Sequence, residues 1–283
     1  MVDRVCDLHQ AIADESFKML QSPDSSVIMD FCDKSGTTTA TGVMRARTTL
    51  DADIAECAAY DFQVMARHFV KASHASGSLE RAITTHNDHC FTGQQVIDLK
   101  IPTFDPREFV SRVVWRWENE KTLLVATETC DSPLFPIRAS IVRGSVVSLA
   151  KFEKLEPIDD FPQTRLTWTL QPDLAGLVPK KLVNAGVVQQ LIYASKLRAK
   201  FDQSKMMDAA SASRLVDMIR AHGGEYMDEE QRIIEAGHDR LKLFETLKSK
   251  DLQMESPSTK AKVAFKDNDS HAWGRATTTV RAE

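Results

Sequence analysis

The stretch that decides the fold reads TRLTWTLQPDLAGLVPKKLVN and spans residues 164–184. Apolar and polar residues alternate in its first half, so Leu166, Trp168 and Leu170 share one face of a strand expected over residues 163–171. Pro179 suits the first turn of a helix, because that position needs no backbone N–H donor. This segment therefore predicts a β-strand that is followed closely by a helix.

The predicted helix spans residues 179–203 and is amphipathic. Its apolar residues recur every three or four positions, which places them on one stripe made of Val183, Val187, Leu191, Ala194, Leu197 and Phe201. A stripe of this length needs an apolar surface to cover it. We expect a β-sheet to provide that surface.

Short β-branched and aromatic segments upstream, separated by turn residues, predict such a sheet. Strands are expected at residues 27–33, 39–50, 79–86, 90–100, 109–118, 121–130, 138–150 and 163–171. Helices are expected over 2–21 and 53–71. At the start of the second, Asp53 is followed three residues later by Glu56, a pattern that resembles a capping box. The predicted fold class is α/β (α+β): a helix-grip fold, in which a curved antiparallel sheet wraps around a long C-terminal helix and further helices follow.

Three motifs occur in order along the chain: Asp105-Pro106-Arg107-Glu108-Phe109-Val110-Ser111-Arg112, then Val142-Arg143-Gly144, then the stretch at 164–184. Over residues 40–203 the sequence resembles the START (steroidogenic-acute-regulatory-related lipid transfer) family. The resemblance implies non-catalytic binding of one phospholipid, sterol or ceramide-like lipid in a tunnel beneath the C-terminal helix. Val113 stands where the sterol-carrying members tend to have a second arginine, which argues against sterol recognition through that charge.

Candidate lipid-binding residues lie on the apolar faces of two strands and of the long helix. They are Val113, Trp115 and Trp117, Leu166 and Trp168, and Val183, Val187 and Leu191. Large rings on neighbouring strands suit an elongated apolar ligand. The alternative is a core that these side chains fill by themselves.

Two further candidates lie elsewhere. Arg143 is expected near Glu128 on a neighbouring strand, where a structural ion pair competes with head-group binding as its role. The loop Ser132-Pro133-Leu134-Phe135-Pro136 is stiffened by two prolines, and we expect Leu134 and Phe135 to form a lid that touches a membrane. An ordinary loop that packs against the domain is the alternative.

Composition excludes several classes of protein. A net charge of -4 gives no basic surface for nucleic acid, and the five widely spaced cysteines are typical of reduced cytosolic thiols. No run of 18 apolar residues is present, so we expect a cytoplasmic protein that binds membranes peripherally. We expect no cofactor, metal or catalytic residue, although an enzyme on the same scaffold would have Glu128, His86 and Asp98 as weak acid–base candidates.

The predicted domains are a START-like lipid-binding domain at 1–204, a linker helix at 205–227 and the start of a second START-like repeat at 228–283. The repeat rests on Gly274-Arg275-Ala276-Thr277, which matches a stretch beginning near Arg45 at an offset of 230 residues. Chance similarity is the alternative. A tandem protein implies contacts with other domains of a longer chain and leaves open a scaffold role without lipid transfer.

Overall fold

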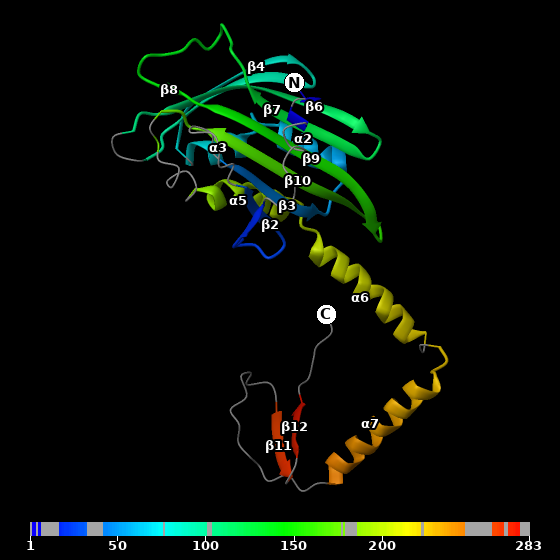
Figure 1. The fold of residues 1–283 in the computed structure, drawn as a ribbon. Helices are drawn as coiled ribbons and strands as arrows, with labels where there is room; N and C mark the ends of the chain where they lie inside the picture. The colour runs from blue at the N-terminus through cyan, green and yellow to red at the C-terminus, as the bar shows by residue number, and fades with distance from the viewer. Residues whose placement is uncertain are drawn as a thin grey trace. The chain divides into compact units, whose positions relative to one another are not determined.

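The computed structural model describes residues 2–3, 5–6, 17–32, 42–75, 77–100, 104–176, 178, 186–221, 224–246, 262–268 and 271–277. The chain divides into two compact units, Met1–Ser213 and Arg214–Glu283. The first unit contains the large sheet and the helices that pack on it (Figure 1).

Within the described residues, ten strands build that sheet: β1 (Lys18–Leu20), β2 (Ile28–Cys32), β3 (Val43–Leu50), β4 (Ser78–Asn87), β5 (Cys90–Ile97), β6 (Arg107–Asn119), β7 (Thr122–Thr129), β8 (Val142–Arg143), β9 (Ser145–Ile158) and β10 (Phe161–Asp173). The order is β1-β2-β3-β10-β9-β7-β6-β5-β4, and β8 pairs with β6 in parallel. The other pairs are antiparallel, as the meander predicts. Within this order β3 pairs with β10, and Ala46 lies opposite Trp168.

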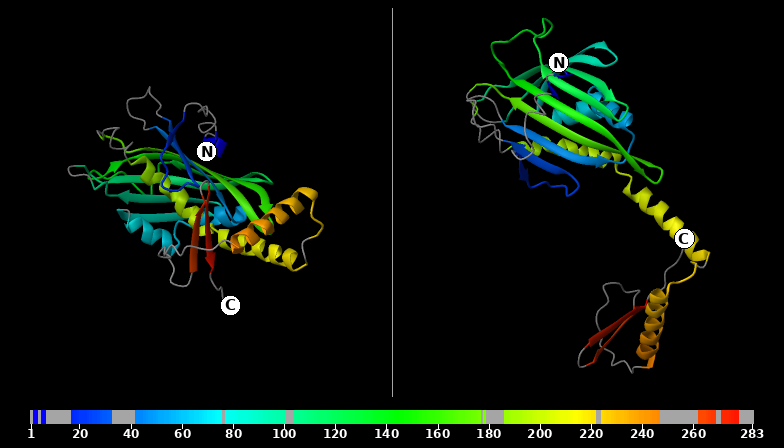
Figure 2. Two further views of the ribbon diagram at one scale, coloured as in Figure 1. Left: turned by 90° about the horizontal axis from the view of Figure 1, so that it is seen from below. Right: turned by 45° about the vertical axis from the view of Figure 1, so that its right-hand side comes forward.

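The inner face of the sheet holds the main core. Helices α2 (Ile54–Phe62) and α5 (Val187–Phe201) pack on this face, and both lie beside the sheet in Figure 1. The largest side chains buried there are Phe152, Met29, Met44, Leu50, Leu166, Leu191 and Leu197. The long helix therefore lies against the curved sheet, which is the predicted helix-grip arrangement (Figure 2).

The outer face is covered in part by the N-terminal residues. Val2 and Val5 pack against Leu124, Ala126 and Leu149, which alternate along β7 and β9 with the residues of the main core. Alternate residues of β7 and β9 thus belong to two apolar clusters, one on each side of the sheet.

Helix boundaries differ from the prediction in two places. The expected helix at 2–21 is wrong at its end, because Lys18–Leu20 form β1 and pair with β2. The expected helix at 53–71 begins as predicted, with the Asp53 side chain accepting from the Ala55 N–H, but it ends at Phe62. A second helix, α3 (Arg67–Ala75), follows a break at which Arg81 donates to the carbonyl of Val64.

Two other boundaries also differ. The predicted strand at 138–150 is a short β8 and a long β9 that runs on to Ile158, since Phe152 continues the inward alternation through charged neighbours. Of the predicted closing helix at 179–203, α5 begins at Val187, and residues 179–185 lie outside the described residues.

Helix α6 (Ser204–Arg220) begins in the first unit, and its residues from Arg214 on belong to the second. The second unit also contains α7 (Asp228–Thr246) and a hairpin of β11 (Lys262–Asn268) and β12 (His271–Thr277). Of all the helices that the structure describes, none is long and apolar enough to cross a membrane.

Candidate functional site

The three sequence motifs meet at one end of the sheet. Arg107 is buried and donates from Nε to the carbonyl of Leu174 at 2.6 Å, which ties the first motif to the third. Gly144 of the second motif has no room for a side chain, because a Cβ there would lie 2.7 Å from the Asp173 carbonyl oxygen and from the Phe109 ring. These motif residues therefore hold the ends of β6, β8 and β10 together.

Arg143 belongs to a polar cluster on the outer face. Its Nη2 lies 2.6 Å from Oε2 of Glu108, a carboxylate that also accepts from Arg138 and Gln94. Burial alone would raise the pKa of Glu108, but hydrogen bonds from Gln94, Arg143 and Arg138 together hold it below its ordinary value. We expected Arg143 to pair with Glu128, which is wrong: it pairs with Glu108, which lies opposite it in the parallel β6–β8 register.

The loop between β7 and β8 is anchored by the same arginine. Arg143 donates to the carbonyls of Phe135 at 2.9 Å and Pro136 at 3.3 Å. Leu134 is 59% exposed and Ile137 76%, whereas Phe135 is partly buried. Ile137 therefore takes the exposed place that was predicted for Phe135. A hollow of about 310 Å³ lies beside this loop and Arg143.

The other predicted lining residues fall into three groups. Val113, Trp115 and Trp168 are partly buried on the inner face, where each packs against the main core. Leu166, Val187 and Leu191 are almost completely buried inside that core. Trp117 lies opposite Leu123 of the main core but is 42% exposed near the β6–β7 turn. Val183 lies outside the described residues.

Sequence reasoning missed a chain of aromatic rings between the inner face and the helices. Ring centroids are 5.3 Å apart for Trp168 and Tyr193, 6.0 Å for Tyr193 and Phe69, and 5.5 Å for Phe69 and Tyr60. These side chains come from β10, α5, α3 and α2. A row of aromatic rings therefore lies beside the aliphatic main core, between β10 and the helices α2, α3 and α5.

A carboxyl group lies among these rings. Tyr193 donates its hydroxyl to Oδ1 of Asp61 at 2.7 Å, which links α5 to α2. Burial raises the pKa of Asp61 to about 6, while the hydrogen bond from Tyr193 partly offsets this rise. The signal was present in the sequence, because Asp61 interrupts the apolar stripe three residues after Ala58 and four after Cys57.

A second hollow, of about 410 Å³, opens at the α2–α3 break. Phe62, Val64 and Met65 line it on the helical side, and Ile83 and Phe91 line it on the side of β4 and β5. The rings of Phe62 and Phe91 lie 5.0 Å apart. The walls of this hollow are mostly apolar, although Gln63, Thr85, Asn87 and Asp88 also line it.

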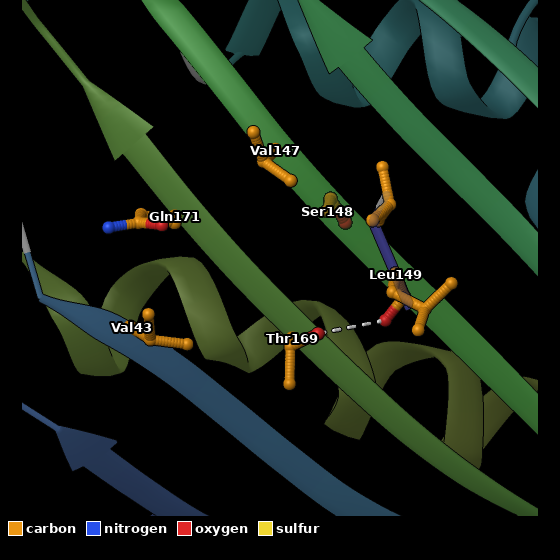
Figure 3. Close-up of a pocket in the computed structure, with 7 residues that line it drawn as sticks. Val43, Val147, Ser148, Leu149, Thr169 and Gln171 are labelled. Carbon is orange, nitrogen blue, oxygen red and sulfur yellow. Dashed lines mark hydrogen bonds between the residues drawn. The ribbon is translucent and has the colours of Figure 1, made fainter. Parts of the chain in front are cut away.

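The pocket in Figure 3 is different in kind. It holds about 20 Å³ on the outer face, between side chains that include Val43, Val147 and Gln171, and Thr169 donates to the Leu149 carbonyl beside it. That volume suffices for a single water molecule. It is too small for a lipid.

The weak acid–base candidates do not converge. Glu128 lies opposite Arg112 on β6, His86 contacts the hydroxyl of Thr92, and Asp98 is exposed and accepts from the Lys100 N–H. Within the described residues no three His, Cys, Asp or Glu side chains gather as metal ligands.

No protein-family model matches the chain, and no curated protein sequence does either. Solved structures do match. Human StAR-related lipid transfer protein 5 superposes with a TM-score of 0.55 and 16% identity, over 70% of this chain and 95% of that one. The fold is START-like. A STAR-related lipid transfer protein fragment from Xanthomonas axonopodis gives a TM-score of 0.52 and 14% identity, over 66% of this chain and 99% of that one.

A third START-like structure, human STARD10, matches with a TM-score of 0.51 and 17% identity, over 69% of this chain and 76% of that one. In this chain Arg107, Gly144 and Leu174 connect the ends of strands in that fold.

Proposed function

We propose that this protein binds one lipid between the inner face of the sheet and the long helix, and carries or senses that lipid at membranes without catalysis. The observation that carries the proposal is the aromatic interior between α2, α3, α5 and β10 on a START-like fold. Binding free energy would come mainly from apolar area, at about 0.8 kcal/mol for each buried methylene group. The solved structures named as lipid transfer proteins support this direction.

We place ligand contact on Val113, Trp115 and Trp168, which are partly buried and therefore accessible to a ligand that displaces neighbouring side chains. Leu166, Val187 and Leu191 are themselves part of the core between the helix and the sheet. The hollow at the α2–α3 break supplies an apolar opening toward this region.

The loop that carries Leu134 and Ile137 is the proposed membrane contact. Both side chains are exposed, while Arg143 fixes the backbone between them through the carbonyls of Phe135 and Pro136. A fixed loop presents its apolar residues with little loss of conformational entropy on binding. Peripheral attachment from the cytoplasm follows as part of the same proposal.

Native mass spectrometry of the full chain purified from eukaryotic cells tests lipid binding. The expected result is one co-purified lipid per chain, identified by extraction. Complete absence of lipid, in protein that also fails to take lipid from liposomes, would favour a scaffold with no transfer activity.

Liposome transfer assays test the loop. Leu134→Asp combined with Ile137→Asp should slow lipid extraction at least tenfold without lowering the melting temperature, because both side chains already lie in water. Ile158→Asp is the matched control, since Ile158 is 50% exposed at the β9–β10 turn. Equal rates in all variants would exclude the loop as the membrane contact.

We also propose that α7 and the β11–β12 hairpin begin a second START-like repeat. In support, β12 contains the stretch that matches β3 at an offset of 230 residues, and β3 is likewise the second strand of an antiparallel pair. The other domains of such a tandem protein would be its partners.

A further inference from the structure

The Asp61–Tyr193 pair is an unusual feature for an apolar interior. The Asp61 carboxylate lies on α2 and its hydrogen-bond donor on α5, and the Tyr193 ring packs against Trp168 and Phe69. Among the residues that the structure describes, no lysine or arginine forms an ion pair with Asp61. A negative charge is thus held beside the aromatic chain by a neutral donor.

The chemistry of this pair defines what it accepts. An ionised carboxylate has two oxygen acceptors and no donor, so the hydrogen bond from Tyr193 to Oδ1 leaves Oδ2 as an acceptor for a ligand. A hydroxyl or an amine can supply the donor. A phosphate or carboxylate head group would instead bring like charge into a region of low dielectric, where repulsion is strong.

We infer that Asp61 and Tyr193 form the polar end of the lipid site and select an amphiphile with an alcohol or amine group over one with an acidic head group. The inference rests on the proposed lipid binding and names the class of lipid. The proposed route for the ligand is the hollow at the α2–α3 break, which is lined by Phe62, the residue that follows Asp61 on α2.

Two fluorescent probes with the same chain test the selection in the full-length protein: 12-(1-pyrenyl)dodecanol and 12-(1-pyrenyl)dodecanoic acid, titrated at pH 7.5. The alcohol should bind at least tenfold more tightly than the acid. Because an ionised acid is also better solvated by water, the decisive quantity is how this ratio changes on mutation.

Asp61→Asn keeps the size and one acceptor of the side chain but removes its charge, and it should lower the alcohol-to-acid ratio at least fivefold. Tyr193→Phe keeps the ring, removes the hydroxyl that orients the carboxylate, and should lower the ratio as well. Glu56→Gln is the matched control, because it makes the same change of charge on an exposed position of α2 and should leave the ratio unchanged.

The outcomes distinguish a failure of lipid binding from a failure of the head-group selection. If wild-type protein binds neither probe and no lipid from liposomes, the proposed lipid binding fails. If both probes bind and the ratio is the same in wild type, Asp61→Asn and Tyr193→Phe, lipid binding stands and the polar selection is refuted. A ratio that changes equally with Glu56→Gln refutes it too, since surface charge would then explain the effect.

Discussion

Replacing Asp61 by asparagine should stabilise the folded protein at neutral pH. Burial raises the pKa of this carboxyl group from its ordinary 3.8 to about 6, so ionisation is less favourable in the folded state than in the unfolded chain. A shift of about two pKa units corresponds to up to about 3 kcal/mol of unfolding free energy. Asparagine cannot ionise, yet its amide oxygen still accepts the hydrogen bond from the Tyr193 hydroxyl.

The pH dependence follows from the direction of the shift. Between about pH 4 and pH 6 the folded state binds more protons at Asp61 than the unfolded state does, so this contribution to stability falls as pH rises and is fully lost near pH 7. The advantage of Asp61→Asn over wild type should therefore be near zero at about pH 4 and largest above about pH 7.

Urea denaturation of both proteins at a series of pH values measures this difference, and the other titrating groups largely cancel in the comparison. The control Glu56→Gln should show no such pH-dependent gain, because Glu56 is exposed. A constant difference between Asp61→Asn and wild type from pH 4 to pH 8, or a destabilised variant at pH 7.5, would refute the reasoning.

Three further predictions concern the frame of the fold. Glu108→Ala should lower the unfolding free energy by about 3–5 kcal/mol, since it leaves Arg143 without its buried counter-ion. Glu80→Ala changes a half-exposed position and should cost less than about 1 kcal/mol. Urea denaturation measures both losses, and equal losses would contradict the buried role of Glu108. Gly144→Ala should cost about 1–3 kcal/mol in the same assay, because its Cβ would collide with a backbone carbonyl, and a neutral result would mean that the strand ends can move apart. A chain that ends after residue 221 should melt cooperatively in calorimetry at the temperature of the sheet unit in the full protein, because that unit has its own core.

Most of the fold could be predicted from local sequence patterns. Alternation along residues 163–171 and the stripe from Val187 to Phe201 gave the strand and the helix that the structure confirms. The misplaced boundaries depend on tertiary contacts instead: Lys18–Leu20 become a strand because β2 offers an edge, and α2 ends where Arg81 reaches the Val64 carbonyl. Helical periodicity reveals neither the pairing with the next strand nor the hydrogen bond across 17 positions.

The candidate site was less accessible to sequence reasoning. Alternation correctly put Val113, Trp115 and Trp168 on one side of the sheet, but it could not tell a ligand surface from the filled core around Leu166 and Leu191. The pairing of Asp61 with Tyr193 joins residues more than a hundred positions apart on two helices. Only the packing of those helices on the sheet brings them together.

The pairing of β3 with β10 has a consequence for how the chain reaches its fold. Residues such as Ala46 and Trp168 are about 120 positions apart. During synthesis β3 therefore cannot pair with β10 until most of the first unit has left the ribosome. Contacts of this separation slow folding, because a long loop must close before they form. Until β10 arrives, the ribbon of β1, β2 and β3 has an open edge, and that edge is where we expect a chaperone or an aggregating neighbour to engage the nascent chain.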